Sequence, residues 1–558
     1  MQPRLVLLSL VLGNLGVGGV KQTPLTTFEP SANLDKKAIE KDSFLIFNEV
    51  NSLLRQWGNT LAPNGFSVTL ASVPANTLLY HARTDVDEPL SPEWFAFDAE
   101  MSYGIYGGRR NTTVYLRTYQ TTAALGPLLY FNGLSAALME STLDTQDLLA
   151  PPPTSNSTRP RDPFADYARA KRLCSWASKR GIEGFVRTNA GFELIWCNMR
   201  DERVKLVRNL DVTAWADDMN DHSDRSGSDE DGENRRHPRE LIEPVPPLSS
   251  TSTATIATSP PFPRPPGRGP PGRGPNMFAR YASWEWLRAT SHVYSGLGEA
   301  RVKLQSGWHA TSRGIDLDST GATRVAQLPV GSIEKWKEDV DRMLRLAIQE
   351  KRVNSGVDWR ALTDLVVDRY GDRLPELGAL LKLAGSNTLS HITRPSVNMT
   401  HVLHAYRITS SILIPFYDRQ ASREQQVETC TFSIAPDITA KDGGAGSFNS
   451  YELKIWTAIL HVHRSICAII LDVHSELATL WSSRATLESS TLETLAGRID
   501  DLIVQLDWPF WVRCPDVCPW GQVCFIPIWP LFGFGSWPRW PGGGRPEPQC
   551  VGSLVDPA

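Results

Sequence analysis

The sequence lacks the short motifs that identify common enzymatic reactions. It contains no H-E-x-x-H zinc-protease motif, no G-x-S-x-G nucleophile elbow, no G-x-x-x-x-G-K-[ST] phosphate loop and no EF-hand loop. Its histidines also lack the spacing of a metal site, because His461 and His463 are two residues apart on an expected helix and point to different sides. No reaction follows from motifs, and we expect no metal site.

The chain also lacks an excess of charge and a long apolar run. The 57 Lys and Arg residues nearly balance the 61 Asp and Glu residues, giving a formal charge of -4, which carries no signature of nucleic-acid binding. The most apolar later stretch, 455–473, is interrupted by His461, His463 and Arg464. We therefore expect no transmembrane segment in the mature chain.

The N-terminus has the features of a secretory signal peptide. One arginine, Arg4, precedes an apolar run that is too short to cross a bilayer, and small residues follow it near Gly19. We expect residues 1–19 to be removed and the protein to be secreted. Three N-x-S/T sequons are candidates for N-glycosylation in that pathway: Asn111, Asn156 and Asn398.

The cysteine content agrees with export, because the number of cysteines is even and all of them can pair in disulfides. Proximity in the sequence favours Cys174 with Cys197 and Cys430 with Cys467, and two further disulfides among the last four cysteines. Zinc is the alternative for the last group, although its spacing lacks paired C-x-x-C units. The eight cysteines are Cys174, Cys197, Cys430, Cys467, Cys514, Cys518, Cys524 and Cys550.

The fold class predicted from the pattern is α+β, with a mixed N-terminal domain and a mainly helical C-terminal domain. Between them lies a stretch that is acidic and then rich in Pro, Gly and Arg, which is typical of a disordered linker and carries a dibasic cleavage candidate at Arg235-Arg236. The expected divisions are 35–215 (α+β), 216–276 (linker), 277–507 (helical) and 508–558 (a Cys-, Trp- and Pro-rich, disulfide-stapled tail).

Hydrophobic periodicity places the main elements. Short apolar runs between 67 and 207 predict strands, and a helix is expected from Asp166 to Arg180, ended by Gly181. Another helix is predicted to run through Phe47 and Trp57 to Gly58. Downstream, apolar residues recur at helical spacing, as the core faces of a bundle do. These stripes begin at Trp336, Ile455 and Leu492.

One order of residues resembles, distantly, the ADP-ribosyltransferase fold of the class that uses a His, a Tyr and a Glu. It comprises His81 on an early strand, Trp94-Phe95-Ala96-Phe97-Asp98 with Tyr106 after it, and Glu193 on a late strand, within 67–207. The resemblance implies catalytic roles for His81 and Glu193, and NAD binding by Trp94 and Tyr106. An aromatic face suits a cationic ring, and a carboxylate stabilises developing positive charge.

The whole chain is also similar to secreted, uncharacterised proteins of filamentous ascomycete fungi. The resembling stretches include 91–98, 142–147, 181–193 and 514–524. This resemblance implies secretion and the same architecture. Because structural features outnumber chemical ones in the sequence, we expect a non-catalytic extracellular binding or structural protein with a protein or carbohydrate partner. The alternatives are an NAD-consuming transferase or glycohydrolase, with NAD as cofactor, and carbohydrate binding by the Trp-rich tail.

Overall fold

The computed structural model describes the greater part of the chain outside its two ends and its central stretch. The signal peptide, the linker, Arg235-Arg236, Asn111 and Asn156 lie outside the described residues, so these predictions are unchanged. The described ranges are 36–55, 67–106, 113–134, 142–152, 165–189, 191–213, 284–289, 299–311, 329–385, 397–434, 448–483, 489–526 and 548–551.

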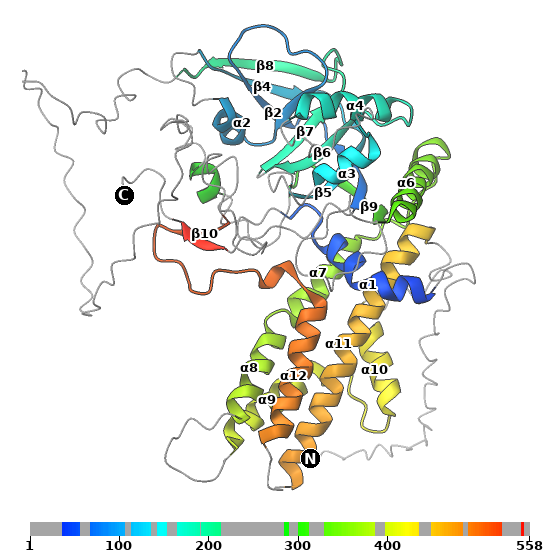
Figure 1. The fold of residues 1–558 in the computed structure, drawn as a ribbon, viewed down its shortest axis with the longest axis vertical. Helices are drawn as coiled ribbons and strands as arrows, with labels where there is room; N and C mark the ends of the chain where they lie inside the picture. The colour runs from blue at the N-terminus through cyan, green and yellow to red at the C-terminus, as the bar shows by residue number, and fades with distance from the viewer. Residues whose placement is uncertain are drawn as a thin grey trace, which may run out of the picture.

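A nine-stranded sheet forms the upper part of the molecule in Figure 1. Its strands follow the order β8-β4-β2-β3-β7-β6-β5-β1-β9. β5 and β6 run parallel, and the other described pairs of this sheet are antiparallel. The strands are β1 (Ser67–Val73), β2 (Leu78–Arg83), β3 (Glu93–Ala96), β4 (Tyr115–Thr121), β5 (Leu125–Leu134), β6 (Gly184–Asn189), β7 (Gly191–Trp196), β8 (Val204–Asp211) and β9 (Lys303–Thr311).

Helices cover the sheet and build a bundle below it (Figure 1). The bundle contains α8 (Arg373–Gly385), α9 (Met399–Leu413), α10 (Arg423–Phe432), α11 (Ser450–Ser483) and α12 (Ser489–Leu506). The remaining elements are α1 (Lys36–Asn51), α2 (Ala99–Tyr106), α3 (Thr142–Leu149), α4 (Asp166–Ser178), α6 (Val330–Leu344), the π-helical turn η5 (Arg345–Gln349), α7 (Trp359–Tyr370), the 3-10 turn η8 (Pro509–Trp511), and the hairpin strands β10 (Val523–Phe525) and β11 (Gln549–Val551).

The predicted α+β class is confirmed: a mixed α/β region with a large sheet precedes a mainly helical region. The sheet nevertheless draws on residues from both sides of the central stretch, since β9 pairs with β1 at the sheet edge. The predicted helix at Phe47 is present but ends at Asn51, before Gly58, and Leu54 adopts a positive φ of 55°. Helix α4 begins at Asp166 as predicted and ends at Ser178, two residues before the predicted Arg180, and Gly181 follows with a φ of 75°.

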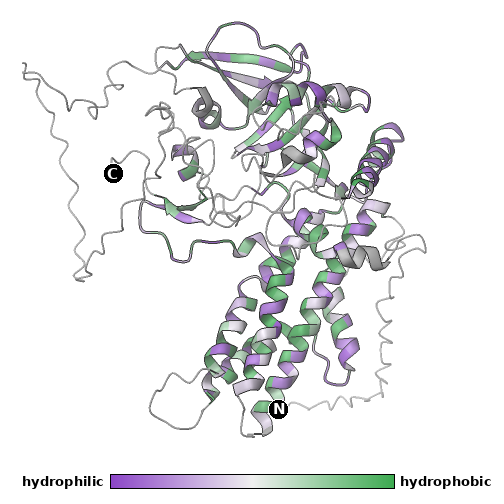
Figure 2. Ribbon diagram, viewed as in Figure 1, coloured by the Kyte–Doolittle hydropathy of each residue, from purple (hydrophilic) through white to green (hydrophobic). Residues whose placement is uncertain are grey.

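The sheet separates two hydrophobic cores. One face, with Phe95 and Leu194, shares a core with α1, α7 and the bundle, including Trp456. The other face, with Phe185 and Ile195, packs against α3, α4 and α6. Figure 2 shows both hydrophobic and hydrophilic residues along each bundle helix, as expected for helices that bury one stripe and expose the other.

Helix α11 is long and apolar enough to cross a membrane by length and composition alone. More than half of its most apolar window is buried inside the protein, and α1, α9, α10 and α12 contact it. The core helix of a folded domain has the same properties.

All eight cysteines form disulfides, including the two pairs predicted from proximity. The Cys174–Cys197 bond joins α4 to the end of β7, and Cys430–Cys467 joins α10 to α11. The pairing that the sequence left open is Cys514–Cys524 and Cys518–Cys550.

Candidate functional site

The pairing of three neighbouring strands, β2, β3 and β7, determines which predicted site residues lie together. Tyr80 pairs with Ala96, and Ala96 pairs with Glu193. Side chains alternate between the faces of a sheet, while directly paired residues point to the same face. Trp94 and Glu193 therefore share one face with Tyr80, and His81 points to the opposite face.

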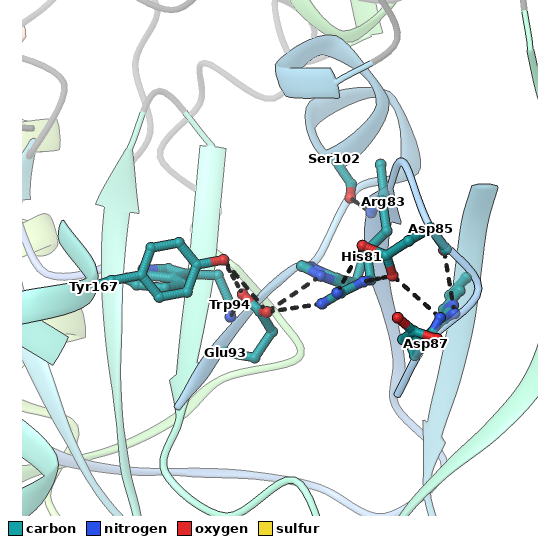
Figure 3. A network of polar contacts seen from close by, with 10 residues as sticks. His81, Arg83, Asp85, Asp87, Glu93, Trp94, Ser102 and Tyr167 are labelled. Atoms are coloured by element: carbon teal, nitrogen blue, oxygen red, sulfur yellow. Dashed lines mark hydrogen bonds and ion pairs between the residues drawn. The ribbon is translucent and has the colours of Figure 1, made fainter. Parts of the chain in front are cut away.

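His81 belongs to a buried polar cluster around the Glu93 carboxylate (Figure 3). The Oε2 atom of Glu93 lies 3.6 Å from His81 Nε2 and 3.3 Å from Arg83 Nη1. Its Oε1 atom accepts hydrogen bonds from the Trp94 N–H and the Tyr167 hydroxyl, both at 3.1 Å. Tyr167 comes from α4 and also meets the Trp94 ring edge-on, with 4.5 Å between the ring centroids. Glu93 thus connects β2, β3 and α4.

Burial decides the charges in this cluster. Desolvation, with a smaller contribution from the nearby Arg83, lowers the pKa of His81 to about 4. The imidazole is therefore neutral at neutral pH, and its 3.6 Å contact with Glu93 is not an ion pair. Burial also raises the pKa of Glu93, although the Trp94 N–H, Tyr167 and Arg83 act in the opposite direction.

Two arginines attach the β2–β3 connection to the sheet beside this cluster. Arg83 binds Asp85 through both of its carboxylate oxygens, at 2.9 and 3.0 Å. Arg117, on β4, donates to the carbonyl oxygen of Asp87 at 2.7 Å. Because His81 and Glu93 are only 6% and 2% exposed, a substrate would reach them only if this connection moved. We interpret the cluster as the attachment of the connection to the sheet.

Glu193 lies in a second buried polar network, on the opposite face. Arg187 Nε donates to Glu193 Oε2 at 3.1 Å, and Asn189 Nδ2 donates to Glu193 Oε1 at 2.9 Å. Arg187 also binds Asp166 at 3.2 Å. Arg169 extends the network by binding Asp166 and Asp147. Helices α3 and α4 are therefore joined to β6 and β7 by charged groups.

Most of the network is buried, although the Asp166 side chain is 34% exposed. Burial by itself would lower the pKa of Arg187, but Asp166 and Glu193 outweigh it and raise that pKa. For Glu193 burial dominates and raises the pKa, while Arg187 and Asn189 partly oppose it. Both oxygens of Glu193 are already occupied by protein donors. This arrangement suits a structural carboxylate better than one that faces a developing cation.

The structure does not assemble the four residues that the resemblance implied. Trp94 and Glu193 share a face, His81 lies on the other, and Tyr106 is the last residue of α2 with its side chain outside the described part. Sequence reasoning missed Arg187, Asp166 and Glu93. Arg187 carried a usable signal, since an arginine inside the apolar strand Gly-Phe-Val-Arg requires a buried partner.

A third buried carboxyl, Glu49, joins α1 to the sheet. Its Oε2 atom accepts hydrogen bonds from the Ser67 hydroxyl and from Asn132 Nδ2, the latter at 3.0 Å. Within the described residues, Glu49 Oε1 has no hydrogen-bond partner. Burial raises the pKa of Glu49 to about 7, with Ser67 and Asn132 only partly offsetting it.

The described tryptophans of the tail divide into packed and exposed rings. Trp508 is buried and stacks on Trp511, with 4.9 Å between centroids, and Trp511 Nε1 donates to the Gly371 carbonyl. Trp520, beside the disulfides, is fully exposed. Trp529, Trp537 and Trp540 lie outside the described residues.

Comparisons with known proteins find relatives among fungal proteins. Residues 34–113 and 106–243 match the family described as the YPL277C N-terminal domain. The chain is similar to "Uncharacterized protein YOR389W" of Saccharomyces cerevisiae, with 23% identity over 88% of this chain and 82% of that protein. It is also similar to "Uncharacterized protein YPL277C" of the same yeast, with 28% identity over 31% of this chain and 43% of that protein. No solved structure matches.

These matches support a resemblance to a group of uncharacterised fungal proteins. The family match includes α1 and β1 to β8, and so includes Glu49, His81, Glu93, Arg187 and Glu193. The long match to the yeast protein extends the similarity across both the sheet and the bundle.

Proposed function

We propose that this protein is a secreted, disulfide-bonded and N-glycosylated protein whose α+β part binds a partner without catalysing a reaction. The observation that carries the proposal is the pairing of all eight cysteines in four disulfides. Disulfides persist mainly in oxidising compartments, to which a signal peptide at 1–19 would deliver the chain.

The surroundings of Asn398 support glycosylation. Asn398 is exposed at the N-terminus of α9, and its side-chain oxygen accepts a hydrogen bond from the Thr400 N–H at 3.0 Å. An N-linked sugar is attached to the amide nitrogen, which this capping bond leaves available. Capping of α9 and modification of Asn398 are therefore compatible.

The separation of His81 from Glu193 supports binding over NAD chemistry. An NAD-consuming enzyme of the implied class needs both side chains to face one bound molecule, whereas here the sheet lies between them.

Carbohydrate binding by the tail is the second alternative. Among the described rings it rests on Trp520, which is exposed, because Trp508 and Trp511 pack against other residues.

Expression of the full chain with its own N-terminus in a eukaryotic secretory host tests the proposal. We expect protein in the medium that begins near Val20 and carries a sugar on the Asn398 peptide by mass spectrometry. Thr400→Ala is the matched control, because it removes the sequon and keeps the Asn398 cap, so this sugar alone should disappear. Protein that stays inside the cell, keeps residues 1–19 and lacks the sugar would contradict the proposal.

A further inference from the structure

Helices α3 and α4 lie side by side over the sheet (Figure 1), and a pocket of about 430 Å³ opens along them. Its volume is in the range of small-molecule sites. The end of α3 supplies one wall and α4 the other, and none of the lining residues is acidic. The lining residues are Leu149, Ala150, Pro151, Lys171, Arg172, Ser175, Trp176, Lys179 and Arg180.

Helical spacing brings the basic side chains of this pocket together. Lys171, Ser175 and Lys179 are four residues apart, so they form one row along α4, about 12 Å long at 1.5 Å per residue. Arg172 and Arg180 belong to the neighbouring row. The flexible side chains of Lys171 and Lys179 can therefore converge on one group above Ser175.

The two arginines bind carboxylates that do not line the pocket, one of which, Asp147, is shared with Arg169, whereas the lysines are exposed. Arg172 binds Asp147 at 2.9 Å and the Ala150 carbonyl at 3.0 Å. Arg180 binds both oxygens of Asp341, at 2.7 and 2.9 Å. Within the described part of the chain, no ion pair involves Lys171 or Lys179. The pocket thus has two positive charges without a matching protein carboxylate.

The rest of the pocket is apolar. Leu149, Ala150 and Pro151 form one side, and the Trp176 ring lies on the other beneath the Arg180 guanidinium, 4.4 Å from its centroid. The bonds from Arg172 to Asp147 and to the Ala150 carbonyl join α4 to the end of α3, and so connect the two sides. A compact ring fits against such a wall while its charged group meets the lysines.

We propose that this pocket binds the phosphate monoester of a small cyclic compound, with Lys171 and Lys179 holding the phosphate and the α3 end contacting the ring. A phosphate monoester carries a charge of roughly -1.5 to -2 at neutral pH, which matches the two lysines. A sulfate ester or a carboxylate carries a single charge and leaves one lysine without a counter-charge. The inference rests on the proposed binding function and names its ligand class.

Calorimetric titration of the secreted, full-length protein with phenyl phosphate tests this inference. We expect millimolar or tighter binding, weaker binding of phenyl sulfate and benzoate, and none of phenol. Each of Lys171→Ala and Lys179→Ala should weaken binding about tenfold, because each removes a charge-assisted hydrogen bond. Both side chains are exposed, so the variants should keep the wild-type melting temperature.

Lys205→Ala is the control, since Lys205 is an exposed lysine on β8 at the far edge of the sheet. It should bind phenyl phosphate as the wild type does. Absence of phenyl phosphate binding, equal binding of phenol or of phenyl sulfate, or unchanged binding by both lysine variants would overturn the inference. If the protein is secreted with its disulfides but does not bind phenyl phosphate, the ligand inference is wrong and the proposed function is unaffected. If the protein is not secreted, the proposed function is wrong.

Discussion

Replacing Arg187 by alanine is expected to lower the free energy of unfolding by about 3–5 kcal/mol, because it leaves buried charge without a partner. Arg187 is 2% exposed and binds Glu193 at 3.1 Å and Asp166 at 3.2 Å. In the variant, Glu193 keeps only Asn189 as a hydrogen-bond donor among its contacts described above. Guanidinium unfolding followed by tryptophan fluorescence measures the change.

Two further variants separate the charge effect from simple truncation. Arg208→Ala removes an exposed arginine of β8 and should change the unfolding free energy by no more than about 0.5 kcal/mol. The double variant Arg187→Met with Glu193→Met should recover part of the loss, because neither of these buried charges then remains. Stability of Arg187→Ala within about 1 kcal/mol of the wild type would show that the network does not join the helices to the sheet.

Glu49→Gln is expected to make the protein more stable than the wild type at pH 8, by roughly 3 kcal/mol. The pKa of Glu49 rises from 4.5 to about 7 on folding. The folded wild type therefore binds more protons than the unfolded chain between these values, and its stability falls as the pH rises from about 4.5 to about 7. Glutamine keeps the shape and hydrogen-bonding oxygen of the protonated form. Unfolding free energies at pH 5 and pH 8 measure the difference.

Glu334→Gln is the control for this pH dependence. Glu334 is an exposed side chain on α6, so its replacement should leave the wild-type pH profile in place. If Glu49→Gln follows the wild-type profile at every pH, then Glu49 does not take up a proton on folding.

Much of the fold follows from local sequence patterns. The stripes beginning at Trp336, Ile455 and Leu492 predicted α6, α11 and α12, because a helix that buries one face must repeat apolar residues at its own period. The sequence reading assigned no strand at β9, whose segment Lys-Leu-Gln-Ser-Gly-Trp-His-Ala-Thr mixes polar residues with a glycine. Strand β9 pairs with β1, which is far away in the sequence, and a local sequence pattern cannot predict such a distant partner.

The candidate site was less accessible to sequence reasoning for a related reason. The disulfides Cys174–Cys197 and Cys430–Cys467 were predictable, since short separations favour pairing. Whether His81 and Glu193 face each other depends on strand order and on the register of β2, β3 and β7, and a shift of one residue reverses a face. In the sequence, Glu93 cannot be distinguished from a surface glutamate, because its partner Tyr167 lies on α4, far away along the chain.

Peptide mapping of the secreted protein under non-reducing conditions tests the central claim most directly, because an oxidised, covalently stapled chain is the basis of the proposed function. The account predicts four linked peptide pairs, Cys174 with Cys197, Cys430 with Cys467, Cys514 with Cys524 and Cys518 with Cys550. Alkylation of these cysteines in the folded protein without prior reduction, or zinc bound by the last four, would contradict it.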